Sequence, residues 1–286
     1  MAVHDVGRHD AAVRRVARAG DPDRAIAALF APPRYRDDLF ALYAFNAELT
    51  KIADQVTEPG LGAIRLQWWR EAIDKAASGE STGHPVADAF GQVMARRGLS
   101  RERIAGLIDA RTFDVGETVM PDTRTLDAYL FDTTGGIFAL AAEIVGAEGE
   151  KRDVVAETGG RAYGLVRVMR SLPLLAAKGR TYLAADALAR HDTAPDDIFA
   201  GETSEGLKAL LGEMRESARA SLREAEFHLY GQGMTGTGLD EAGRTVFLPL
   251  SLVEPYLKAL AKVGDPLRQI ARINPLTRLW RLMRSR

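Results

Sequence analysis

The sequence predicts an all-α protein, and three observations carry that prediction. Apolar residues recur at spacings of three and four along almost the whole chain, as on one face of a helix. No run of alternating β-branched residues lies between hairpin turns. Proline and glycine fall between the periodic segments, where helices start and stop. Because 286 residues are enough to bury one core, we expect a single domain over residues 1–286.

The predicted elements follow one another with short connections. Pro32 and Pro33 open a helix that reaches about Asp54, because proline fits the first turn of a helix. Pro59 and Gly60 separate it from the next helix. Further helices are expected over residues 61–77, 85–97, 101–116, 123–145, 154–172, 205–230, 243–263 and 266–272. The other segments are a frayed N-terminus (1–20), two irregular stretches (183–199 and 231–238) and a basic C-terminal tail (274–286).

Composition excludes several classes of protein. Without cysteine the chain has no disulfide framework, thiolate metal site or cysteine nucleophile. The first ten residues carry charges in place of the apolar core of a secretory signal. The apolar stretch 136–142 ends at Glu143, too short to span a bilayer. We expect a cytoplasmic protein, with peripheral attachment to the inner face of the cytoplasmic membrane as an alternative.

The charge is unevenly distributed along the chain. Residues 257–286 carry a net charge of +7, whereas the chain as a whole has −1. The final segment, NPLTRLWRLMRSR, alternates apolar residues with arginines. It either lies on an anionic membrane surface or docks its apolar face on the bundle and leaves the arginines solvated. The candidates for membrane contact are Arg278, Trp280, Arg281 and Arg284. Nucleic-acid binding is not expected, because the remainder is acidic and holds no recognised motif.

The predicted helix over residues 34–54 carries two stripes of side chains. One stripe is apolar and faces the core. The other runs beside it, with members one turn apart. The apolar members are Leu39, Leu42, Phe45, Leu49 and Ile52, and those of the second stripe are Tyr43, Asn46 or Ala47, Thr50 and Asp54. The spacing leaves two interpretations open for the second stripe, a cavity wall or a partly exposed polar edge.

Four segments together resemble a known family. They are DPDRAIAALFAPPRYRDDLFALYAFNAELTKIAD (21–54), IRLQWWREAI (64–73), LDAYLFDTTGGIFALAAEIVG (126–146) and GRAYGLVRVMRSLPLLAAKGRTYL (160–183). In order and spacing they are similar to the squalene/phytoene synthase family. The resemblance implies the isoprenoid-synthase fold, a helical bundle around a central cavity.

In that family, aspartates on two helices hold Mg²⁺ against the diphosphates of two prenyl substrates. Here Thr50 and Lys51 occupy the first aspartate cluster, so that only Asp54 remains. The polar and acidic positions of the second motif are replaced by Gly164, Arg167, Ser171, Leu174 and Leu175. We therefore expect no metal site, no cofactor and no catalytic residue; magnesium is expected only if the chain is an active synthase.

The second motif has gained basic residues in place of its acids. They could grip a phosphate group, or they could pair with cavity acids and point to solvent. The candidate ligand-binding residues of the cavity are Tyr43, Asn46, Thr50, Asp54, Arg167, Arg170, Ser171, Lys178, Arg180 and Tyr182.

One branch of the family shares both the lost aspartates and a signature, EPxxGxIRLQWWR, which is present over residues 58–70. This branch resembles assembly factors for respiratory complex I. The resemblance implies a non-catalytic protein that aids assembly of a membrane respiratory complex by binding an assembly partner or a prenyl or lipid-like ligand. Two alternatives stay open: a magnesium-dependent prenyltransferase that condenses two prenyl diphosphates head to head, and a helical scaffold whose cavity has collapsed.

Overall fold

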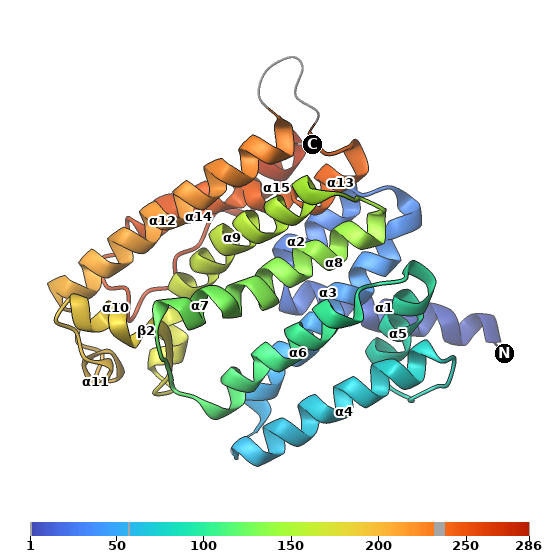
Figure 1. Cartoon of the computed structure of the whole chain (residues 1–286), viewed down its shortest axis with the longest axis horizontal. Coiled ribbons are helices and arrows are strands. Elements are labelled where there is room, and N and C mark those ends of the chain that lie inside the picture. Colours follow the sequence, from blue (N-terminus) through green and yellow to red (C-terminus); the bar gives the residue numbers. More distant parts are fainter. Residues whose placement is uncertain (1, 57, 232–237, 286) are drawn as a thin grey trace.

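A computed structural model describes residues 2–56, 58–231 and 238–285, with side chains from residue 11 onward. The chain forms a bundle of helices, as predicted (Figure 1). The α-helices are α1 (Ala2–Gly20), α2 (Pro22–Ala27), α3 (Pro33–Gln55), α4 (Pro59–Ala77), α5 (Pro85–Arg97), α6 (Arg101–Gly116), α7 (Thr123–Leu130), α8 (Gly136–Val145), α9 (Glu150–Ala176), α10 (Ala185–Arg190), α11 (Pro195–Phe199), α12 (Glu205–Tyr230), α13 (Glu241–Val246), α14 (Val253–Leu260) and α15 (Pro275–Arg284). Short 3-10 turns η1 (Ala28–Phe30) and η3 (Leu248–Leu252), a π-turn η2 (Phe131–Gly135) and two parallel strands, β1 (Val119–Met120) and β2 (Thr181–Ala184), complete the fold.

Local sequence signals set most helix ends. The Ser100 side chain accepts a hydrogen bond from the Arg103 amide at the start of α6, and Ser204 does the same for the Leu207 amide of α12. Gly98 ends α5 with a positive φ that other residues adopt only at a cost. These caps fix where each helix begins and ends, and so fix the faces that meet in the core.

The helices pack in neighbouring pairs around α8, nearly all of whose residues are buried. α12 lies along α9, while α1, α5 and α8 contact α3. Figure 1 shows α4, α5 and α6 on one side of α8 and α9, α12 and α14 on the other. Residues of α3, α6 and α9 line a cavity between these helices.

Three predicted segments differ from the structure. The helix expected over 123–145 is continuous but contains the π-turn η2, which lets Gly135 pack against Gly160 of α9. The helix expected over 243–263 is divided into α13, η3 and α14, and Pro249 lies at the break. Residues 266–268 form a single turn and residues 269–272 are irregular, so no helix is present over 266–272, although Asp265 accepts the Leu267 amide as a helix cap would.

The irregular stretch expected over 183–199 instead contains the end of β2 and the short helices α10 and α11. The N-terminal segment also differs from its prediction. Residues 11–20 are not frayed but belong to α1, because Val13 and Ala17 bury their side chains in the core. The stretch 231–238 falls largely outside the described residues.

The run of residues 123–145 is long and apolar enough to cross a bilayer by length and composition alone. In this fold 72% of its most apolar window is buried by other helices. Its apolar character therefore serves the core of the bundle.

Candidate functional site

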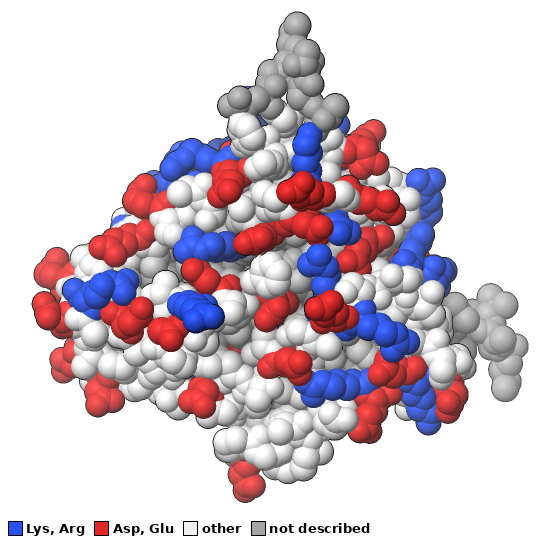
Figure 2. Space-filling view, viewed as in Figure 1, with Lys and Arg blue, Asp and Glu red and all other residues white. Residues whose placement is uncertain are grey.

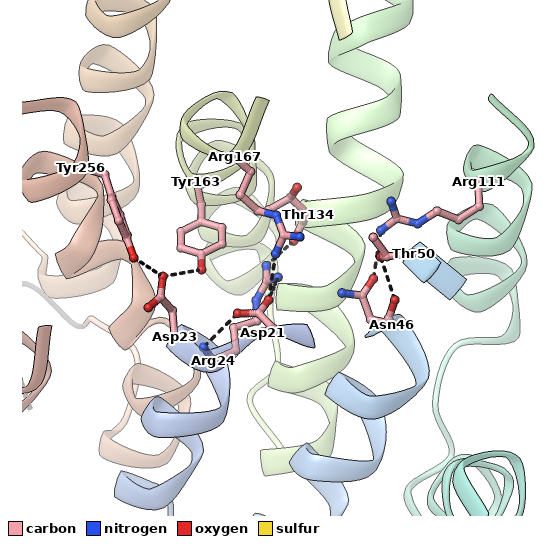
Figure 3. Close-up of polar contacts among 10 residues, drawn as sticks. All are labelled: Asp21, Asp23, Arg24, Asn46, Thr50, Arg111, Thr134, Tyr163, Arg167 and Tyr256. Atoms are coloured by element: carbon pink, nitrogen blue, oxygen red, sulfur yellow. Dashed lines mark hydrogen bonds and ion pairs between the residues drawn. The ribbon is translucent and has the colours of Figure 1, made fainter. Parts of the chain in front are cut away.

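The space between the helices is a cavity of about 360 Å³. Side chains from α2, α3, α6, α7, α9, α14 and α15 line it, together with η2 and β2. Figure 3 shows part of its polar lining, in which residues far apart in the sequence point toward one another. Three groups of buried ionic contacts make up this lining.

The first group centres on Asp21, the residue before α2. Its carboxylate accepts the Arg24 amide at 3.2 Å, the Arg24 guanidinium at 3.1 Å and the Arg167 guanidinium at 3.0 Å. Arg24 also donates to the carbonyl of Thr134 in η2 at 3.2 Å (Figure 3). Burial acts to raise the pKa of Asp21, but the charges of the two arginines and the hydrogen bonds from Arg24 lower it below its ordinary value. Asp21 therefore stays ionised although it is buried.

The second group centres on Asp23. Its carboxylate accepts the hydroxyl of Tyr256 at 2.8 Å and that of Tyr163 at 3.4 Å. The Arg278 Nε lies 2.7 Å from the other carboxylate oxygen. Burial, with the nearby charges of Asp21 and Asp23, raises the pKa of Tyr163 well above its ordinary value, so this phenol stays neutral.

The position of Arg278 corrects one expectation. This residue was a candidate for membrane contact, but its side chain turns inward and also donates to the Tyr256 hydroxyl at 3.1 Å. An arginine that is paired inside the cavity is not available to a lipid surface. Of the other candidates, Trp280 and Arg284 are exposed and Arg281 is half-buried.

The third group centres on Asp114 of α6. Arg111 contacts this carboxylate at 3.1 Å, the Asn46 side-chain oxygen at 3.0 Å and the Tyr129 hydroxyl at 2.8 Å. Tyr129 and Tyr182 both donate to Asp114, at 2.9 and 2.6 Å. Burial raises the pKa of both phenols, which keeps them protonated as donors. Asp114 is thereby held by one cation and two hydroxyl groups.

At the rim of the cavity, Asp54 forms an ion pair of 2.5 Å with Lys178, and both side chains are more than half exposed. The Thr50 hydroxyl donates to the Asn46 carbonyl at 2.8 Å. Lys51 faces away and pairs with Glu48 at 2.9 Å. Asn46, Thr50 and Asp54 of the second stripe line the cavity, while Asp54 at its rim is also exposed, so the flank has features of both interpretations.

Two of the ten candidate residues lie outside the lining. Tyr43 is buried behind the wall, where burial raises the pKa of its phenol, and Lys178 reaches the rim only through Asp54. The eight that line the cavity are Asn46, Thr50, Asp54, Arg167, Arg170, Ser171, Arg180 and Tyr182.

The sequence did not predict more than half of the polar side chains that line the cavity. The segment that resembles the family begins with Asp21, Asp23 and Arg24, which line the cavity. This position in the segment is the signal that could have identified them as candidates. Arg111 and Asp114 are three residues apart on one predicted helix, a pattern that equally describes a surface pair.

The residues of the cavity do not fit Mg²⁺. A magnesium ion needs several oxygen ligands, commonly one or two carboxylates that are free to bind it. Among the described residues, no three His, Asp or Glu side chains are grouped so that they could hold a metal. Each of the four lining aspartates is already paired with a cation: Asp21 with Arg24 and Arg167, Asp23 with Arg278, Asp54 with Lys178, and Asp114 with Arg111.

A helical bundle around a polar cavity defines the isoprenoid-synthase class of fold. Squalene synthase HpnC from Alicyclobacillus acidocaldarius shares this architecture, with a TM-score of 0.75 and 20% identity over 89% of this chain and 93% of that chain. Residues 17–281 match the squalene/phytoene synthase family, so the chain belongs to that family.

Curated relatives include both assembly factors and synthases. The chain is 26% identical over 247 residues to NADH dehydrogenase (ubiquinone) complex I, assembly factor 6 of Bos taurus. This alignment covers 86% of this chain and 72% of the relative. It is 24% identical over 237 residues to phytoene synthase of Thermus thermophilus. This alignment covers 82% of this chain and 76% of the synthase. The family resemblance seen in the sequence, including its assembly-factor branch, is confirmed.

Proposed function

We propose that this protein is a non-catalytic member of its family that helps to assemble a membrane respiratory complex of the complex I type, at the cytoplasmic face of the membrane. The observation that carries the proposal is the pairing of all four cavity aspartates with arginine or lysine. Acids in such pairs are poor ligands for the magnesium ions that drive diphosphate ionisation. The similarity to complex I assembly factor 6 supports the role in assembly.

The cavity is still suited to an anionic, lipid-like ligand. Six arginines and four aspartates are among the residues that line it, an excess of positive charge. Among the described contacts, Arg170 donates to the Ala271 carbonyl and lies over the Tyr256 ring, while Arg180 donates to the Asp114 carbonyl. Neither guanidinium is paired with a described carboxylate, so both can meet a phosphate group. Leu130, Val168 and Leu174 supply apolar wall for a hydrocarbon chain.

We expect no turnover of prenyl diphosphates. The purified protein, incubated with farnesyl or geranylgeranyl diphosphate, magnesium and NADPH, should release no more pyrophosphate than a sample without protein, because the cavity aspartates are paired with cations and are not free to bind the magnesium that neutralises the leaving group. The Thermus thermophilus phytoene synthase, assayed alongside, shows that the conditions support the reaction. Pyrophosphate release with formation of squalene or phytoene would contradict the proposal and favour the prenyltransferase alternative.

Deletion of the gene tests the role in assembly. We expect membranes of the deletion strain to contain several-fold less assembled NADH dehydrogenase complex, measured by native gel electrophoresis and by NADH oxidation. The wild-type gene should restore the complex, and so should Asp54→Asn, since the proposal gives the last motif aspartate no catalytic task. An unchanged amount of complex in the deletion strain, or rescue by wild type but not by Asp54→Asn, counts against the proposal.

A further inference from the structure

The C-terminal helix α15 turns its apolar side outward. Its residues at i, i+3, i+4 and i+7 fall on one face of the helix. The opposite face meets the bundle through the fully buried Leu282 and through Arg278. A helix at the surface of a soluble protein ordinarily buries its apolar stripe. The outward residues, each at least 45% exposed, are Leu276, Leu279, Trp280 and Met283.

A basic groove lies next to this helix in the chain. It has a volume of about 380 Å³ and runs along the end of α14 and residues 269–272. Lys258, Lys262 and Arg272 line it, and no acidic residue does so among the residues described. On the face drawn in Figure 2, acidic and basic side chains are interspersed. Lys258 also pairs with Glu254 at 3.9 Å, whereas no ion pair is described for Lys262 or Arg272, so the groove carries a net positive charge.

The groove and the cavity share a wall. Ile270 lines both of them. The neighbouring Ala271 accepts a hydrogen bond from Arg170 of the cavity at 3.2 Å. Arg272 then precedes the start of α15 by three residues. One continuous stretch of chain thus carries a basic groove, part of the cavity wall and an outward apolar helix face.

We propose that these features form a lipid-docking surface, which consists of the groove residues Lys258, Lys262 and Arg272 and the outward face of α15. The apolar row enters the headgroup region of a bilayer, and the groove binds phosphate groups of anionic phospholipids. The guanidinium groups of Arg281 and Arg284 lie 5.5 and 5.1 Å from the centre of the Trp280 ring, which places cations beside the apolar row. The proposal rests on the proposed function for a location at the membrane, and it adds the surface and the class of lipid.

Vesicle flotation of the full chain tests this surface. The protein should float with vesicles of phosphatidylcholine and phosphatidylglycerol, and not with phosphatidylcholine alone. The variant Lys258→Glu/Lys262→Glu/Arg272→Glu should lose at least about 100-fold in binding, since each basic residue near an anionic surface contributes about fivefold and the three glutamates add repulsion. The variant Leu279→Ser/Trp280→Ser should also lose binding, because it removes the centre of the apolar row.

A matched triple variant controls for net charge. Lys75→Glu/Arg190→Glu/Lys208→Glu reverses three exposed charges on α4, α10 and α12, and it should bind as wild type does. Unchanged thermal unfolding of each variant shows that the fold is intact. Equal binding by both triple variants, or equal binding to neutral vesicles, overturns the proposal.

The assay also separates the two proposals. Flotation uses purified protein, whereas the role in assembly is measured in the deletion strain. If the protein binds anionic vesicles but deletion of its gene leaves the complex intact, the lipid-docking surface is supported and the proposed function is overturned. If the deletion strain lacks the complex but the purified protein binds no vesicle, the proposed function is supported and the lipid-docking surface is overturned.

Discussion

Replacement of Arg24 by alanine is expected to lower the free energy of unfolding by about 3–5 kcal/mol, because it leaves a buried aspartate without its main cation. Only 2% of the Arg24 side chain is exposed, and it holds both Asp21 and the Thr134 carbonyl. Its guanidinium also lies 4.5 Å from the ring centre of Phe138 and 4.9 Å from that of Tyr163. Urea unfolding followed by circular dichroism measures the change.

The surface offers a matched control for Arg24. Arg14 pairs with Asp37 at 2.5 Å, and these side chains are 41% and 59% exposed. Solvent weakens such a pair, so Arg14→Ala should cost less than about 1 kcal/mol. If both variants lose the same stability, the buried network is not what holds α2 against α9.

Replacement of Gly160 by alanine is expected to destabilise the fold by about 3 kcal/mol, since it forces a methyl group into a backbone crossing. A Cβ at this position would lie 2.4 Å from the Gly135 Cα and 2.6 Å from its nitrogen. Backbone atoms cannot rotate away as the tip of a side chain can, so α9 and η2 would have to separate. The same unfolding experiment measures this loss.

Gly60 of α4 provides the control for this second substitution. No atom lies within 4 Å of a Cβ built there, and its φ is not in the left-handed region. Gly60→Ala should therefore leave stability unchanged or raise it by up to about 1 kcal/mol, through the better helix propensity of alanine. A Gly160→Ala variant as stable as this control would show that the crossing can relax.

Elements with strong local signals could be predicted from the sequence. The helices over 85–97, 101–116 and 205–230 begin and end where proline, serine and glycine predict. The π-turn η2 could not be predicted, because it depends on the packing of Gly135 against Gly160 of another helix. The absence of a helix over 266–272 could not be predicted either, because Pro266 and the Asp265 side chain, which accepts the Leu267 amide, are typical of a helix start.

The cavity was predictable where a family motif runs along one helix. Thr50, Asp54 and Arg167 lie in such motifs and do line the cavity. Asp23 and Arg278 stand at opposite ends of the sequence, and only the tertiary fold brings them into contact. Charge pairs between distant segments leave no periodic pattern in the sequence. The pairing of the cavity acids with cations therefore could not be predicted and is seen only in the structure.

The contact between Asp23 and Arg278 also has a consequence for biosynthesis. The carboxylate is made with α2, whereas its cation is made much later in the chain, within α15. While the ribosome extends the chain from its N-terminus, α2 has no counter-ion for this acid and cannot settle into the bundle at full stability. The ion pair therefore forms only after α15 has been synthesised, and a chain that stops short of α15 leaves the Asp23 carboxylate without this cation.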